Sequence, residues 1–328
     1  PTRRSSDLKD KKVLFITTKN LDYIRNTQEI NIIKENSKEY KIIGSKEKSY
    51  PKRIVTVYWN ILKTSMKNFD LVFIGFAPQL ILPIWNFKLK KKKIIIDFFI
   101  SMYDTLVFDR KKIKENSIFA KILKAIDKKT ILLADYIISD TKEHGKYFIE
   151  EFGANKNNLN VLYLEADKSI YYEKRIEKPN KVKDKFVVLY FGSILPLQGV
   201  EIVLGAVDIL KKEKDIFFYV IGPIQKKYNK VESDNVKYID WLSQQELAKY
   251  INFSDLCLAG HFNKNINKAR RTIPGKAYIY DAMNKKMILG ENPANHELFT
   301  ETKGKYYFVE MGSSEKLAEK ILEIKKEN

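Results

Sequence analysis

The 328-residue chain is poor in cysteine and acidic residues, and it lacks long apolar runs. Its single cysteine, Cys257, excludes an internal disulfide framework and a zinc site built on several cysteines. No apolar run approaches the roughly 18 residues that span a bilayer, and no signal peptide opens the chain. We therefore expect a cytoplasmic protein. Its contact with the inner face of the plasma membrane would be peripheral.

The shortage of acidic residues leaves a strong positive charge. Lys and Arg number 60 against 41 Asp and Glu, which gives a net charge of +19. Such a charge suits nucleic acid, an anionic membrane surface or phosphorylated ligands. The excess is mostly lysine and comes with many Asn, Ile, Tyr and Phe, so a bias toward A/T-rich codons also explains it. The basic run FKLKKKK, 87–93, is the best candidate for contact with anionic lipid; the other interpretation is a solvated loop before a strand.

The first eight residues, PTRRSSDL, are the translation of a widely used sequencing adapter, so we expect 1–8 to be non-native. The chain stops directly after a helical pattern, at ILEIKKEN, and we expect this end to be artificial too.

Short apolar runs alternate with longer segments of helical spacing. KKVLFITT at 11–18 is the first such run, and Ile118, Ile122, Ala125, Ile126 and Lys129 show the helical spacing. Strands that are apolar on both faces and alternate with helices indicate a parallel sheet covered on both sides. The pattern predicts a Rossmann-like domain over 9–168.

A charged segment without periodicity, 169–185, reads as a linker, and the alternation restarts at 186. Ser243 and Glu246 form a capping box that predicts a helix start. One predicted helix carries an apolar stripe of Val200, Val203, Leu204, Val207 and Leu210. The fold class is therefore α/β, with a second Rossmann-like domain over 186–328 and a cleft facing the carboxyl ends of both sheets.

Two stretches of the second domain suit an anion. In FGSILPLQG a strand ends at Gly192 and a helix follows Gly199, and glycines at such a turn let the backbone approach a phosphate. In RRTIPGK, Arg270, Arg271 and Lys276 precede or open another helix, whose dipole favours negative charge. The spacing matches neither GxGxxG nor a P-loop.

The stretches 190–210 and 268–299 resemble the donor-binding domain of bacterial glycosyltransferases of family 4, which have the GT-B fold. DFFISMYDTLVFDRK, 97–111, resembles the acceptor domain of a subgroup that makes cell-surface polysaccharides. The resemblance covers nearly all of 11–325. It implies transfer of a sugar from a nucleotide-diphosphate sugar to a cell-surface glycan or lipid-linked acceptor, with retention of configuration and without a metal ion or other cofactor.

The resemblance also assigns residues to roles. Arg271 and Lys276 would stabilise the departing phosphate oxygens, and Glu297 matches a family position near the donor phosphates. The donor site would comprise Gly192, Gln198, Gly199, Arg270, Arg271, Pro274, Gly275, Lys276 and Glu297. The acceptor side would comprise Ser101, Tyr103, Asp104, Thr105, Asp109, Arg110 and His144.

Three departures from the family pattern bear on activity. Gln198 stands where a Lys or His is usual, and Ile279 stands where a Glu typically holds the donor ribose. Asp281 points to another helix face and substitutes poorly. Asn284 and Lys286 replace a usual Gly and Pro. These changes indicate either an altered donor or lost activity.

Structural interpretations stand beside the functional ones. A lone histidine such as His144 is more often structural than catalytic. The loop charges Asp104, Asp109 and Arg110 suit an ion pair as well as an acceptor site, and Glu297 suits a local cap. Tyr171 and Tyr172 lie in the predicted linker and suit packing better than sugar stacking.

Two other functions stay open besides sugar transfer. A catalytically degenerate GT-B protein that serves as a partner or scaffold fits Ile279 and Gln198. A basic nucleic-acid-binding protein fits only the net charge, and since the chain has no recognisable reading motif we expect no nucleic-acid partner. The sequence does not specify the sugar, the nucleotide base, the acceptor or the linkage.

Overall fold

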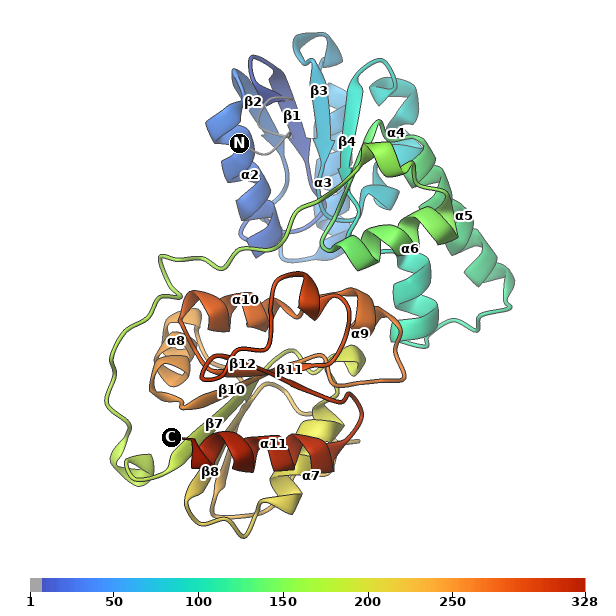
Figure 1. Cartoon of the computed structure of the whole chain (residues 1–328). Helices are drawn as coiled ribbons and strands as arrows, with labels where there is room; N and C mark the ends of the chain where they lie inside the picture. The colour runs from blue at the N-terminus through green and yellow to red at the C-terminus, as the bar shows by residue number, and fades with distance from the viewer. Residues whose placement is uncertain (1–7, 328) are drawn as a thin grey trace. The chain divides into compact units, whose positions relative to one another are not determined.

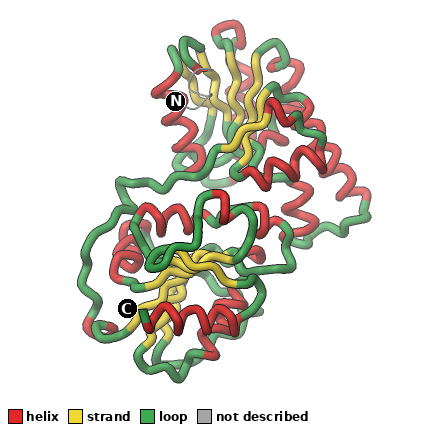
Figure 2. Tube along the Cα trace, in the orientation of Figure 1, coloured by secondary structure: helices red, strands yellow, loops and turns green. Residues whose placement is uncertain are grey.

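A computed structural model describes residues 8–327, and it divides between Glu165 and Ala166 into two compact units. We call residues 8–165 unit 1 and residues 166–327 unit 2. Residues 1–7 of the predicted adapter segment lie outside the described residues, while Leu8 is buried in unit 1. In each unit the strands lie inside and the helices outside (Figures 1 and 2).

Unit 1 contains a six-stranded parallel sheet in the order β2-β1-β3-β4-β5-β6. The order reverses beside β1, between β1 and β3. The strands are β1 (Lys12–Ile16), β2 (Glu39–Ile43), β3 (Leu71–Ile74), β4 (Lys93–Asp97), β5 (Tyr136–Ser139) and β6 (Leu159–Val161). The helices are α2 (Ile24–Asn36), α3 (Tyr50–Lys63), α4 (Leu82–Leu89), α5 (Ile118–Leu132) and α6 (Lys142–Phe152).

Alternate side chains of the unit 1 strands enter two separate cores, because successive residues of a strand point to opposite faces. Val13 and Phe15 of β1 pack with Ile30 and Ile33 of α2. Leu14 and Ile16 belong to the core that includes residues of α3 to α6. Burial on both faces is the arrangement that the continuous apolar runs predict.

Unit 2 contains a second six-stranded parallel sheet, in the order β12-β11-β10-β7-β8-β9. Here the order reverses between β7 and β10. The strands are β7 (Phe186–Phe191), β8 (Ile216–Ile221), β9 (Val236–Ile239), β10 (Leu256–Gly260), β11 (Met287–Gly290) and β12 (Tyr306–Val309). The helices are α7 (Val200–Ile209), α8 (Gln244–Phe253), α9 (Lys268–Arg271), α10 (Gly275–Ala282) and α11 (Ser314–Lys326).

Several local predictions are confirmed in unit 2. All five residues of the predicted apolar stripe of α7 are buried. Ser243 caps α8, because its Oγ accepts a hydrogen bond from the Glu246 amide at 3.2 Å. The predicted linker packs against the rest of unit 2, since the Lys178 ammonium lies 2.5 Å from Asp255 Oδ2. Of its two tyrosines, Tyr171 is buried and Tyr172 is exposed.

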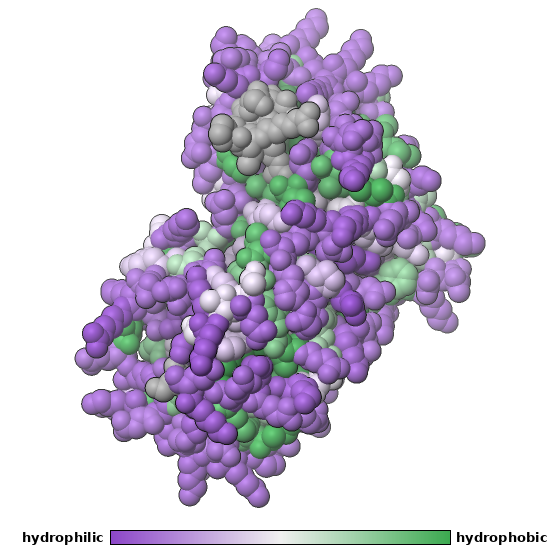
Figure 3. Space-filling view, viewed as in Figure 1, coloured by the Kyte–Doolittle hydropathy of each residue, from purple (hydrophilic) through white to green (hydrophobic). Residues whose placement is uncertain are grey.

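The predicted helix over α5 is present, but its spacing does not mark the buried face. Ile118 and Ile122 are exposed, whereas Asp127 and Thr130 are fully buried. The visible surface is mostly hydrophilic, with hydrophobic side chains in small groups (Figure 3). Among the described residues, no helix combines the length and the apolar character needed to cross a bilayer.

Candidate functional site

The carboxyl ends of β7 and β10 bring together the loops of the candidate donor site in unit 2. The Phe262 amide, two residues past β10, donates to the Gln198 carbonyl at 3.2 Å. Gly199 has φ +67°, and a Cβ there would lie 2.7 Å from the Asn263 amide nitrogen. The close approach of the two loops therefore requires glycine at 199. Ligands of open α/β sheets bind at such a reversal of strand order.

Lys276 is the central residue of this region. It lies in the first turn of α10, whose N-cap is Pro274, and it is only 5% exposed. Its Nζ lies 3.8 Å from the centroid of the Tyr190 ring. Among the described residues this Nζ finds no hydrogen-bond partner. Burial lowers the pKa of Lys276 well below its usual value, since no carboxylate offsets the loss of hydration.

Gly192 and Gln198 complete the surroundings of this ammonium group. A Cβ on Gly192 would lie 3.2 Å from Lys276 Nζ and 2.5 Å from Gln198 Oε1. The Tyr190 hydroxyl donates to Gln198 Oε1 at 3.2 Å. A larger residue at 192 would therefore displace both side chains. The structure thus brings three predicted donor-site residues to one place.

The remaining donor-site predictions lie on adjoining segments. Arg270 is exposed and Arg271 is half-buried, and both end α9, a short helix that the sequence did not predict. Pro274 is buried and Gly275 is exposed. Glu297 is half-buried in a turn that begins at Ala294, whose amide donates to the Arg270 carbonyl at 3.4 Å.

The departures at Ile279 and Asp281 have structural counterparts. Ile279 is buried on α10, one turn after Lys276. Asp281 accepts a hydrogen bond from the Tyr306 hydroxyl and lies 3.3 Å from the Lys305 ammonium. Asp281 is therefore held by the β12 region, in agreement with its expected position on another face of the helix.

The predicted acceptor residues of unit 1 follow β4 in a turn and a π-helix, Asp104–Asp109. Ser101, Tyr103, Asp104 and Asp109 are buried, Thr105 is partly buried and Arg110 is exposed. A π-helix is rare and occurs frequently at functional sites.

Asp127 holds this turn, and sequence reasoning missed it. Its carboxylate accepts hydrogen bonds from Ser101 Oγ at 2.6 Å, the Tyr103 amide at 2.9 Å and Gln79 Nε2 at 2.8 Å. Burial raises the pKa of Asp127, while these hydrogen bonds lower it. Its signal was the single acidic residue of a helical segment that otherwise combines apolar residues with lysines.

His144, the seventh predicted acceptor residue, lies in the first turn of α6, which follows β5. It is fully buried, its Nδ1 lies 2.7 Å from Asp140 Oδ1, and its ring lies 4.3 Å from the Phe148 ring. Its Nε2 finds no hydrogen-bond partner among the described residues, so both the structural and the acceptor-site interpretations of His144 stay open.

A second cluster in unit 1 was not predicted. Arg25 of α2 makes two 2.8 Å hydrogen bonds to the carboxylate of Asp97, the last residue of β4. Glu29 lies 3.6 Å from Arg25 Nε, and Arg25 Nη1 donates to the Leu162 carbonyl. Burial opposes the charge of Arg25, but Asp97 and Glu29 more than offset it, so the pKa of the guanidinium is raised.

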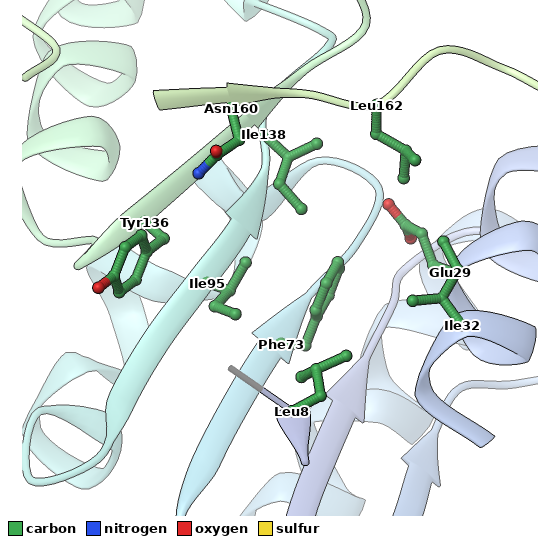
Figure 4. Close-up of a pocket in the computed structure, with 9 residues that line it drawn as sticks. All are labelled: Leu8, Glu29, Ile32, Phe73, Ile95, Tyr136, Ile138, Asn160 and Leu162. Carbon is green, nitrogen blue, oxygen red and sulfur yellow. The ribbon is translucent and has the colours of Figure 1, made fainter. Parts of the chain in front are cut away.

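Unit 1 also contains an apolar cavity of about 30 Å³ beside Glu29. Phe73, Ile95 and Ile138 line it from three neighbouring strands, with Leu8 close to them (Figure 4). Pockets for small organic ligands measure about 300 Å³ or more, so this cavity is too small for a nucleotide sugar.

Comparison with solved structures identifies the architecture. The chain superposes on HepE of Anabaena, in complex with UDP, with a TM-score of 0.64 and 12% identity, over 96% of this chain and 90% of that one. It superposes on sucrose-phosphate synthase of Thermosynechococcus elongatus with a TM-score of 0.66 and 10% identity, over the same shares. The structural neighbours are GT-B glycosyltransferases.

This chain has the GT-B fold. The predicted fold class is therefore confirmed. At 10–12% identity the likeness shows the fold alone.

Sequence comparison adds one distant relative. It is an uncharacterised 41.2 kDa protein in the cps region of Klebsiella pneumoniae, 24% identical over 205 residues. The match spans 60% of this chain and 56% of that protein, little more than half its length. No protein-family model matches the sequence.

Proposed function

We propose that this GT-B protein is a glycosyltransferase that takes its sugar from a nucleotide-diphosphate sugar bound to unit 2. The observation that carries the proposal is the buried ammonium of Lys276 at the reversal of strand order, for which the described residues supply no hydrogen-bond partner. A buried charge is costly unless it is paired. A diphosphate would supply the missing partner, and the start of α10 would add its dipole.

The same arrangement suits the chemistry of sugar transfer. When the bond between the sugar and the nucleotide breaks, negative charge grows on the phosphate oxygens. Lys276, with Arg271 at the end of the preceding helix, would stabilise that charge in a site sheltered from water. A leaving phosphate oxygen can take the proton of the acceptor hydroxyl, so the reaction needs no metal ion and retains the configuration of the sugar, as expected of family 4.

The comparisons guide the choice of substrates. HepE of Anabaena was captured with UDP, which makes UDP-sugars the first donors to test. The Klebsiella relative is assigned to a cps region, which agrees with an acceptor that is a cell-surface glycan or its lipid-linked precursor. The membership of the cell-surface polysaccharide subgroup rests on the sequence resemblance.

A thermal-shift screen against UDP-, GDP- and dTDP-sugars tests this proposal, with Lys276→Ala and Arg270→Ala as a matched pair of variants. A ligand that binds only the folded protein raises its apparent stability. We expect one nucleotide class to stabilise the chain, Lys276→Ala to abolish the effect and the exposed Arg270→Ala to weaken it less. Equal stabilisation of the parent and Lys276→Ala would contradict this site.

The second candidate is a GT-B protein that no longer turns over and serves as a partner of an active enzyme. Ile279 favours it, because a buried isoleucine cannot accept hydrogen bonds from ribose hydroxyls. The test offers the protein a sugar nucleotide together with a range of glycan acceptors. Binding of the sugar nucleotide without release of its nucleoside diphosphate would support this candidate over the first.

A further inference from the structure

Helix α3 carries two apolar stripes, and only one of them is used in the core. Val57 and Ile61 are fully buried against the sheet of unit 1. Val55, Trp59 and Leu62 form a second stripe at helical spacing on the exposed side. A helix that only covers a sheet needs one apolar stripe, so the second requires another explanation.

Helix α4 extends this exposed stripe. The rings of Tyr58 and Trp85 lie 5.5 Å apart, and Lys88 of α4 donates to the Ile61 carbonyl at 2.8 Å, so the two helices are neighbours. Ile84 and Phe87 are the exposed apolar residues of α4. We call Val55, Trp59, Leu62, Ile84 and Phe87 the α3–α4 patch; their exposed fractions range from 51% to 68%.

The chain around this patch is almost free of negative charge. Residues 50–93 contain nine lysines and arginines but one acidic residue, Asp70, whose carboxylate accepts a hydrogen bond from the Lys12 amide. The Lys63 ammonium lies 4.6 Å from the centroid of the Trp59 ring. The exposed lysines of this region are Lys52, Lys63, Lys67, Lys90, Lys91 and Lys93.

We propose that the α3–α4 patch docks on the surface of an anionic lipid bilayer. Large apolar side chains with Trp, bordered by lysine, are the features of surfaces that lie in the bilayer interface. Each lysine near anionic lipid adds electrostatic attraction, and a long lysine side chain can reach the headgroups while the apolar residues enter the acyl boundary. The nearly uniform positive charge disfavours a second copy of the same patch, which would bring like charges together.

Vesicle sedimentation tests the proposal with the full chain and without any sugar nucleotide. The vesicles are phosphatidylcholine alone or with about 30% phosphatidylglycerol, an anionic lipid. We expect binding to the anionic vesicles, weakening as salt rises. The double variant Trp59→Ser, Phe87→Ser should bind at least about tenfold more weakly. A second double variant, Lys90→Gln, Lys91→Gln, should reduce both the binding to anionic vesicles and the dependence of this binding on salt.

Trp241 provides the matched control, because it is 78% exposed and belongs to unit 2. Trp241→Ser should bind the vesicles as the parent chain does. Thermal unfolding of each variant shows that it is folded, and unchanged UDP binding by the double variant would separate this proposal from the donor site.

Four results would overturn it. The first is no binding to anionic vesicles, and the second is equal binding by the double variant. The third is loss of binding in Phe119→Ser, which would move the contact to the exposed apolar start of α5. A dimer in sedimentation velocity that the double variant abolishes would assign the patch to a second copy and overturn the lipid proposal too.

Discussion

Arg25 in unit 1 and Lys276 in unit 2 are both buried cations at the carboxyl ends of parallel strands, yet their surroundings differ. Arg25 has a bidentate carboxylate partner in Asp97, a second carboxylate in Glu29 and a backbone carbonyl. Lys276 has an aromatic ring, a glycine and an amide side chain near it, and its Nζ has no hydrogen bond among the described residues.

Under the proposed function, Arg25 holds the fold whereas Lys276 binds a ligand. The Arg25 pairs hold α2, the end of β4 and the chain at Leu162 together. Burial disfavours the charged form of Lys276 in the free protein, and a pKa perturbed in this way is typical of functional groups. Removing the two cations should therefore have opposite consequences.

The largest effect is expected from Arg25→Ala. It leaves the carboxylate of Asp97 buried without its partner, which typically costs about 3–5 kcal/mol of the free energy of unfolding. Equilibrium unfolding in urea measures the loss. A loss below about 1 kcal/mol would show that Asp97 finds another partner and that the pair does not hold unit 1 together.

The next effect concerns ligand affinity rather than stability. Lys276→Met keeps most of the length of the side chain and removes its charge. UDP should therefore bind about 10- to 150-fold more weakly, since a hydrogen bond to a charged group contributes about 1.5–3 kcal/mol. Isothermal titration calorimetry measures both affinities. Equal affinities would exclude Lys276 from the donor site.

A smaller effect should appear in the dependence of stability on pH. Because burial lowers the pKa of Lys276 below its ordinary value of 10.5, the unfolded chain binds a proton that the folded chain does not over the range between the two values. Stability relative to Lys276→Met should then rise with pH in this range, by at most about 1.4 kcal/mol per pH unit. Urea unfolding of both proteins at several alkaline pH values gives the difference, and a flat difference would argue against a lowered pKa.

The smallest effect is expected from Arg270→Ala. Arg270 is exposed, so its loss should change the free energy of unfolding by no more than about 0.5 kcal/mol. The same urea unfolding measures it beside Arg25→Ala. A large loss would mean that exposure does not distinguish these cations, and the comparison with Arg25 would fail.

The sequence predicted the alternation of strands and helices because buried parallel strands are continuous apolar runs. It did not predict β12 or α9, which are four residues each. The helical spacing read from the sequence does not coincide with the buried side of α5. That side includes Asp127 and Thr130, and Asp127 is accommodated only because the distant turn at Ser101–Tyr103 supplies its hydrogen bonds.

The candidate donor site was partly predictable. Lys276, Gly192 and Gln198 were chosen from local motifs, and the structure brings them together. Whether Lys276 has a hydrogen-bond partner depends on which side chains pack around it in the folded protein. The local spacing of residues in the sequence does not contain that information. The pairing of Arg25 with Asp97, 72 residues apart, escaped prediction for the same reason.

The most direct test of the central claim is the pKa of the Lys276 side chain, measured by NMR on protein with isotope-labelled lysine, with and without UDP. The signal is assigned by its disappearance in Lys276→Met. The account predicts a pKa well below 10.5 in the free protein and a marked rise when UDP binds, because the diphosphate stabilises the ammonium form. A pKa that UDP leaves unchanged while it binds would contradict the assignment of Lys276 to the phosphates.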